Sequence, residues 1–140
     1  MRRLLLDGWH VFTCSSGKAP CDLVAIRDSE VVRIEVKGCA TPKPHGGYPV
    51  SLRSVRSNRS GTIVRRLDTR SSDVVAVFLL AADLVCFFRT SDLAGRNSLT
   101  IFPGRHDGSV RRTFAADYVT LPDGAVAEWT KATALKVVDP

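Results

Sequence analysis

The strongest constraint on the fold is an apolar run from Val74 to Phe88 that a single acid, Asp83, interrupts. Val74–Leu80 and Leu84–Arg89 are rich in valine and phenylalanine, and Ala81-Ala82-Asp83 between them is long enough for a tight turn. Strands that are apolar on both faces are buried on both faces, so we expect this hairpin to lie centrally in a sheet. The run is shorter than the roughly 18 residues that suggest a membrane span, and no membrane partner is expected.

Other elements follow from strand, turn and cap signals along the chain. Leu23–Arg27 and Val31–Lys37, separated by Asp28-Ser29-Glu30, predict a second β-hairpin. The remaining predictions are a helical stretch over Arg2–Asp7 ended by Gly8, strands at Trp9–Cys14, Val50–Arg53 and Ser98–Phe102, a helical turn at Thr90–Leu93 and a short helix at Ala125–Leu135.

Composition excludes several classes of protein. The chain has 140 residues, 44% of them hydrophobic and 24% charged, which fits one folded domain and excludes a large modular enzyme. Lys plus Arg outnumber Asp plus Glu by 20 to 14, and the net charge of +6 favours a polyanionic partner. The N-terminal apolar stretch ends at Asp7, too early for a secretion signal, and the four cysteines lack zinc-ligand spacing. We expect reduced thiols and an intracellular, cytoplasmic protein.

Three ionisable residues gather on the first hairpin. Glu35 and Lys37 are two positions apart, so their side chains project from the same face of a strand. A two-residue loop at Ser29-Glu30 sets Asp22 opposite Lys37, on that same face, and a four-residue loop gives the same pairing. A three-residue loop would instead place Asp22 on the far side.

Two carboxylates beside one ammonium group are suited to metal-assisted hydrolysis of a phosphodiester. Mg²⁺ prefers oxygen ligands and uses one or two protein carboxylates together with water and substrate phosphate. Asp22 and Glu35 would supply those oxygens, while Lys37 would orient the attacking water and offset developing negative charge. A Glu-X-Lys pair also occurs as a solvated surface pair on a strand edge, and the residues alone leave this reading open.

The pattern of Pro20, Asp22 and Glu35-Val36-Lys37 resembles the PD-(D/E)XK nuclease core. The sequence is similar to archaeal Holliday-junction resolvases and to the group I intron homing endonucleases of this superfamily. The resemblance extends from Gly8-Trp9-His10-Val11 to near Phe102.

The resemblance implies an α/β fold in which helices flank a central mixed β-sheet. It implies that Asp22 and Glu35 ligate Mg²⁺, with Mn²⁺ as a substitute and the Val36 carbonyl as a third ligand, and that Lys37 is the catalytic lysine. Residues 1–102 would form the nuclease-like core, and residues 103–140 a C-terminal extension packed on the same domain.

An arginine cluster follows the first hairpin. Between residues 53 and 70 the single acid is Asp68, against six arginines that we expect to bind the phosphate backbone: Arg53, Arg56, Arg59, Arg65, Arg66 and Arg70. A solvated basic loop is the alternative. Nothing in the sequence specifies bases.

The sequence thus favours a Mg²⁺-dependent DNA endonuclease of homing, junction-resolving or restriction type, with no small-molecule cofactor. Since one such site cuts one strand, we expect a homodimer acting on near-symmetric DNA. The alternative is a catalytically impaired, nuclease-like DNA-binding protein, because the acid that the family carries on its first helix would precede Met1. A basic surface that meets an acidic protein is a third possibility.

Overall fold

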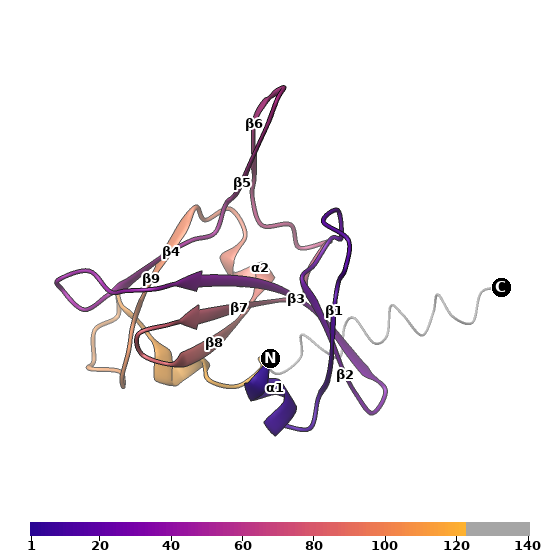
Figure 1. Cartoon of the computed structure of the whole chain (residues 1–140). Coiled ribbons are helices and arrows are strands. Elements are labelled where there is room, and N and C mark those ends of the chain that lie inside the picture. The colour runs from indigo at the N-terminus through magenta and orange to yellow at the C-terminus, as the bar shows by residue number, and fades with distance from the viewer. Residues whose placement is uncertain (123–140) are drawn as a thin grey trace.

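The apolar run forms the predicted hairpin, and it belongs to a five-stranded mixed sheet with the order β1-β2-β3-β7-β8 (Figure 1). The computed structural model describes residues 1–122, so the helix expected at Ala125–Leu135 lies outside the described residues. The strands of this main sheet are β1 (His10–Thr13), β2 (Leu23–Arg27), β3 (Glu30–Cys39), β7 (Val74–Leu79) and β8 (Leu84–Arg89). β3 and β7 run parallel, and the other neighbours run antiparallel.

We expected both strands of the apolar hairpin to lie centrally in the sheet, and this is wrong for β8, which forms one edge of the main sheet within residues 1–122. The hairpin is apolar because each of its faces is covered by another layer. Val75, Val77 and Cys86 pack against a second sheet, whereas Ala76 and Phe87 pack on the opposite face with Leu4 and Trp9.

The second sheet has three strands in the order β10-β9-β4 within the described residues. They are β4 (Tyr48–Ser51), β9 (Ser98–Phe102) and β10 (Thr113–Phe114). The strand predicted at Val50–Arg53 therefore begins and ends two residues earlier. Ser98–Phe102 is a strand as predicted.

The third sheet is a two-stranded hairpin of β5 (Ser54–Asn58) and β6 (Gly61–Arg65), and it projects from the rest of the molecule (Figure 1). We expected an arginine-rich cluster here and assigned no strands to it. In the sequence, the hairpin follows β4 of the second sheet and precedes β7 of the main sheet, and its strands belong to neither of these sheets.

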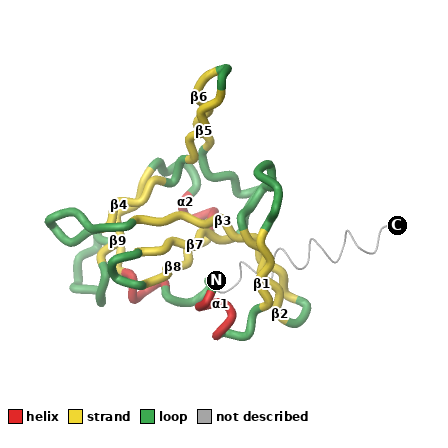
Figure 2. The backbone as a smooth tube through the Cα atoms, viewed as in Figure 1, coloured by secondary structure: helices red, strands yellow, loops and turns green. Residues whose placement is uncertain are grey.

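Helices are short in this molecule (Figure 2). They are α1 (Arg2–Leu6), α2 (Thr90–Leu93) and the 3-10 helix η1 (Ala115–Tyr118). The α/β class and the mixed sheet are confirmed, but the second sheet covers the face where flanking helices were expected. None of the helices within residues 1–122 is long and apolar enough to cross a membrane.

The register of the first hairpin differs from the prediction by two residues. Arg27 pairs with Glu30, so the turn is Asp28-Ser29, and Asp28 has the left-handed φ of +53° that a tight turn requires. The turn is still two residues long, and a shift of two residues keeps every side chain on its face. The predicted convergence of Asp22, Glu35 and Lys37 on one face survives the wrong register.

Candidate active site

A cleft of about 540 Å³ opens beside β3, on the face of the main sheet that also packs against the second sheet. Glu35 and Lys37 lie opposite Val75 and Val77 of β7, whose side chains are fully buried in the core below. The cleft is lined by Ala19, Pro20, Asp22, Glu35, Val36, Lys37, Leu52, Ser54, Val55, Arg65, Arg66, Leu67, Asp68, Ser71 and Ser72. The three ionisable residues singled out in the sequence therefore share one cleft.

Asp22 directly precedes β2 and is held by hydrogen bonds to the neighbouring strand β3. Its backbone N–H donates to the carbonyl of Ile34 at 3.0 Å, and its Oδ2 accepts from the backbone N–H of Val36 at 2.8 Å. β2 begins at Leu23, so the carboxylate occupies the place where a longer strand would have paired with Val36. The contact fixes the Asp22 carboxylate beside the backbone of β3.

Glu35 and Lys37 form an ion pair inside the cleft. Lys37 Nζ lies 3.2 Å from Glu35 Oε1 and donates to Ser54 Oγ at 2.8 Å. The exposed fractions of the two side chains are 12% for Lys37 and 22% for Glu35. The ammonium group is thus held between a carboxylate of β3 and a hydroxyl at the start of β5.

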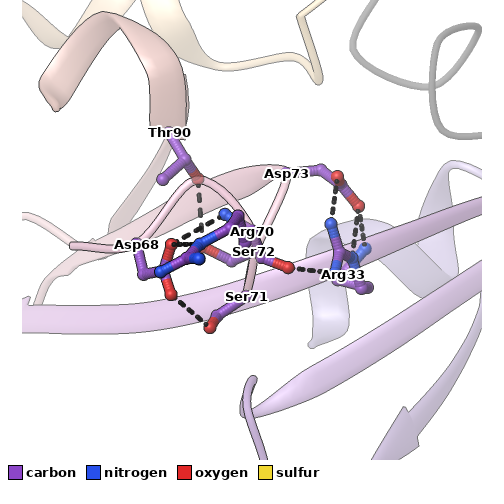
Figure 3. A network of polar contacts seen from close by, with 7 residues as sticks. All are labelled: Arg33, Asp68, Arg70, Ser71, Ser72, Asp73 and Thr90. Atoms are coloured by element: carbon purple, nitrogen blue, oxygen red, sulfur yellow. Dashed lines mark hydrogen bonds and ion pairs between the residues drawn. The ribbon is translucent and has the colours of Figure 1, made fainter.

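A third acid, Asp68, lines the cleft but is engaged in local structure (Figure 3). Its Oδ1 accepts from the Arg70 backbone N–H at 2.9 Å, and its Oδ2 accepts from Ser71 Oγ at 3.1 Å. The hydrogen bond from the Arg70 backbone N–H, followed by that from Ser71, lowers the pKa of Asp68 below its ordinary value. Asp68 therefore stabilises the loop before β7.

The arginine cluster is spread along the projecting hairpin and this loop. Arg65 and Arg66 line the cleft. Arg53 is exposed before β5, Arg56 belongs to β5, and Arg59 is exposed at the hairpin turn. Arg70 is exposed and its Nε lies 3.4 Å from Asp68 Oδ1. The cluster thus borders the cleft on one side and extends away from it on the other.

Two cysteines lie next to the cleft wall. Cys14 Sγ and Cys21 Sγ are 3.9 Å apart, and Cys21 directly precedes Asp22. Burial, together with the contact to Cys14, raises the pKa of Cys21 to about 11. All four cysteines are free thiols, as expected.

The donor set of the cleft is oxygen-based. Within residues 1–122, no group of three or more His, Cys, Asp or Glu side chains is arranged to hold a metal ion. Asp22 and Glu35 are two carboxylates that line one cleft, and Mg²⁺ uses one or two protein carboxylates at sites where substrate phosphate completes the coordination. The chemistry of these donors fits a hard divalent cation.

Sequence reasoning missed Ser54, Ser71 and Ser72, which also line the cleft. A lone serine in a basic stretch carries no signal of its own. Ser54 lies near Lys37 because the start of β5 lies beside β3. This neighbourhood arises from tertiary structure, so the distance between the two residues in the sequence does not predict it.

The chain is similar to known nucleases in both sequence and structure. A family model described as "PD-(D/E)XK endonuclease" matches residues 1–119. Among solved structures, a bacterial homing endonuclease, I-Ssp6803I, is similar with a TM-score of 0.67 and 17% sequence identity, over 99% of this chain and 88% of that chain. No curated protein matches this chain. At that identity the likeness to I-Ssp6803I shows a shared fold.

Proposed function

Because this chain belongs to the PD-(D/E)XK endonuclease family, we propose that it is a Mg²⁺-dependent endonuclease that hydrolyses DNA phosphodiesters in the cleft beside β3. The observation that carries the proposal is the convergence of Asp22, Glu35 and Lys37 on that one cleft. Family membership supports nuclease chemistry and DNA as the substrate. The choice of metal and the residue roles are our proposal.

Asp22 and Glu35 would hold the cation. The Val36 N–H faces Asp22, and since the N–H and C=O of one strand residue point toward the same side, the Val36 carbonyl is a suitable third ligand. The bound ion would supply Lewis-acid stabilisation of the scissile phosphate and a more acidic water.

Lys37 would position the attacking water and stabilise negative charge on the phosphate. Its ion pair with Glu35 and its bond to Ser54 hold the ammonium group at one place in the cleft. A charge that is fixed before the reaction needs little reorganisation when the transition state forms. Its low exposure strengthens that interaction relative to a lysine in water.

Arg65 and Arg66 would hold the DNA backbone at the cleft, and Arg53, Arg56, Arg59 and Arg70 would extend the contact outward. Guanidinium groups form paired hydrogen bonds with phosphate oxygens, which fix the position of the duplex without reading its sequence.

Cleavage of supercoiled, linear and four-way-junction DNA tests the proposal. We expect nicking with Mg²⁺ or Mn²⁺ and none with EDTA. Lys37→Ala, Glu35→Gln and Asp22→Asn should each lower the rate by about a hundredfold or more, since each removes charge at the reacting centre.

Matched controls exist within the chain. Lys43→Ala, Glu30→Gln and Asp28→Asn make the same changes at exposed or half-buried positions that do not line the cleft. These three variants should cut like wild type. Equal losses in both sets would overturn the assigned roles.

Binding without cutting under any divalent metal would support the alternative function, a catalytically impaired DNA-binding protein. That alternative is favoured by one observation, the presence of two rather than three metal-ready carboxylates, since both oxygens of Asp68 already accept hydrogen bonds.

We also propose that the active form is a homodimer, since one cleft per chain cuts one strand. Light scattering with and without duplex DNA tests this directly. A monomer on cleaved duplex would contradict it.

A further inference from the structure

We propose that the β5–β6 hairpin is a β-ribbon that enters the major groove of duplex DNA and reads base pairs next to the cleavage point. This inference rests on the proposed function and deepens it, because it assigns sequence selectivity to the part of the hairpin that projects beyond the cleft.

The backbone of the hairpin projects away from the two larger sheets (Figure 2). Within residues 1–122, β5 and β6 pair only with each other, and every residue of β6 is exposed. A two-stranded hairpin without a covering layer is only marginally stable in water. Such an element is expected where a partner completes its packing.

Three aliphatic side chains on the hairpin are open to solvent. The exposed fractions are 63% for Val55, 50% for Ile63 and 52% for Val64. Val55 and Val64 are directly paired across the two strands. Val55 and Val64 share one face of the ribbon and Ile63 lies on the other, so apolar side chains are exposed on both faces, which indicates a contact surface rather than a core.

The charge around these side chains selects the partner. Arg53 and Arg59 are exposed at the start and tip of the hairpin, and Arg65 and Arg66 at its end. Asp68 is the single acid between residues 53 and 70, and it is bonded to Arg70 and Ser71. Two copies of such a surface would repel each other, whereas a polyanion is attracted.

The base of the hairpin is tied to the cleft. Ser54, the first residue of β5, accepts the hydrogen bond from Lys37 Nζ, and its paired residue Arg65 lines the cleft. Ile63 and Arg65 are two positions apart on β6 and so share the face that carries Ser54. DNA lying in the cleft would therefore meet this face of the ribbon.

Dimensions favour the major groove. A two-stranded ribbon fits a groove about 12 Å wide, where aliphatic groups contact the thymine methyl and arginine contacts guanine. Strands of five residues are roughly 17 Å long, or about five base-pair steps. The base pairs read by the hairpin should lie within about five positions of the cut.

The test is cleavage of a randomised duplex library with Mg²⁺, followed by sequencing of the cut ends. The key variant replaces Ile63 and Val64 together by threonine, because these two residues of β6 do not line the cleft. Threonine keeps β-branching and strand propensity but adds a polar group. We expect its base preference within five positions of the cut to fall at least tenfold, while total cutting of the pool changes less than threefold. Val110→Thr is the matched control, since Val110 is 97% exposed outside the hairpin, and it should keep the wild-type profile.

A second measurement separates failure of this inference from failure of the proposed function. Dimethyl sulfate reports guanine N7 in the major groove, so Glu35→Gln protein bound to duplex DNA should protect guanines there, and the threonine variant should not. If the protein protects guanines but the wild type does not cut DNA, the proposed nuclease function is rejected and the proposed role of the hairpin in base reading is supported. If the threonine variant keeps the wild-type base preference and the wild-type guanine protection, the proposal that the ribbon reads bases is overturned. It is also overturned if the variant loses an oligomeric state while its base preference stays unchanged, because the hairpin would then be a contact between protein chains.

Discussion

Arg33 and Asp73 form a bidentate ion pair between β3 and the start of β7 (Figure 3). Arg33 Nη2 lies 3.0 Å from Asp73 Oδ1, and Arg33 Nε donates to Asp73 Oδ2 at 3.2 Å. The backbone N–H of Arg33 donates to the same Oδ2 at 2.9 Å. The pair lies where the loop over residues 67–72, which borders the cleft, enters the main sheet, so it links the stability of the fold to the shape of the candidate site.

Loss of this carboxylate should destabilise the protein. Asp73→Asn removes the negative charge that faces the half-buried guanidinium of Arg33, so the free energy of unfolding should fall by about 1 to 3 kcal/mol. Urea denaturation measures the change. Asp107→Asn is the matched control, because its ion pair with Arg112 is half exposed and 3.8 Å long, and it should cost less than about 0.5 kcal/mol. Equal losses in both variants would contradict a structural role for the pair.

Local patterns in the sequence predicted most of the main sheet. The apolar hairpin and the faces of Glu35 and Lys37 follow from strand alternation, which a register shift of two residues leaves unchanged. The exact turn was missed because neither Asp28-Ser29 nor Ser29-Glu30 contains the glycine that marks most two-residue turns. Asp28 tolerates the left-handed φ of +53° that it adopts, which favours the observed turn.

Other features depended on tertiary contacts. The β5–β6 hairpin was missed because serine and arginine dominate it, which hides the strand propensity of Val55, Ile63 and Val64. The edge position of β8 follows from sheet order, and no local pattern encodes sheet order. The roles of Asp22, Glu35 and Lys37 and the division of the chain at residue 102 stay predictions.

Salt dependence should separate the arginines that meet phosphate from those that do not. Arg66 lines the cleft, so Arg66→Ala should reduce the slope of log affinity against log salt by about 0.9, the value for one lost phosphate contact. Fluorescence anisotropy with duplex DNA between about 50 and 200 mM salt gives the slope. Arg111→Ala removes an exposed arginine elsewhere and should leave the slope unchanged. The same slope in both variants would remove Arg66 from the interface.

Ser54 should matter for rate more than for binding. Ser54→Ala removes an acceptor of Lys37 Nζ and leaves the ion pair with Glu35 in place. We expect kcat for DNA cleavage to fall about three- to tenfold with KM nearly unchanged, because the lysine is less well positioned. Ser51→Ala is the control, since Ser51 Oγ donates to the backbone carbonyl of Arg53 and Ser51 does not line the cleft. A kcat equal to wild type would show that Glu35 alone positions Lys37.

Cys14 and Cys21 should form a disulfide under mild oxidation. Their Sγ atoms are 3.9 Å apart, so a shift of about 2 Å brings them to bonding distance. With diamide as oxidant, both thiols lose their hydrogens and the reagent is reduced to the hydrazine. Peptide mapping without reductant should find the 14–21 cross-link, formed faster as pH rises, since the pKa of Cys21 is raised to about 11 by burial and the Cys14 contact. A Cys14→Ser variant should give no such species, and cross-linking through Cys39 instead would contradict the geometry.

Cys86 should make stability fall in alkaline solution. Its side chain is fully buried in the core between the two sheets, and burial raises the pKa of the thiol from 9.0 to about 11. Above pH 9 the unfolded chain releases a proton that the folded protein keeps, so the free energy of unfolding declines until about pH 11. The two-unit shift corresponds to about 2 to 3 kcal/mol. Urea denaturation of wild type and Cys86→Ala at pH 8 and pH 11 isolates this contribution, because the variant has a lower stability at pH 8 but a smaller alkaline loss. Parallel declines in the two proteins would show that other groups cause the alkaline loss.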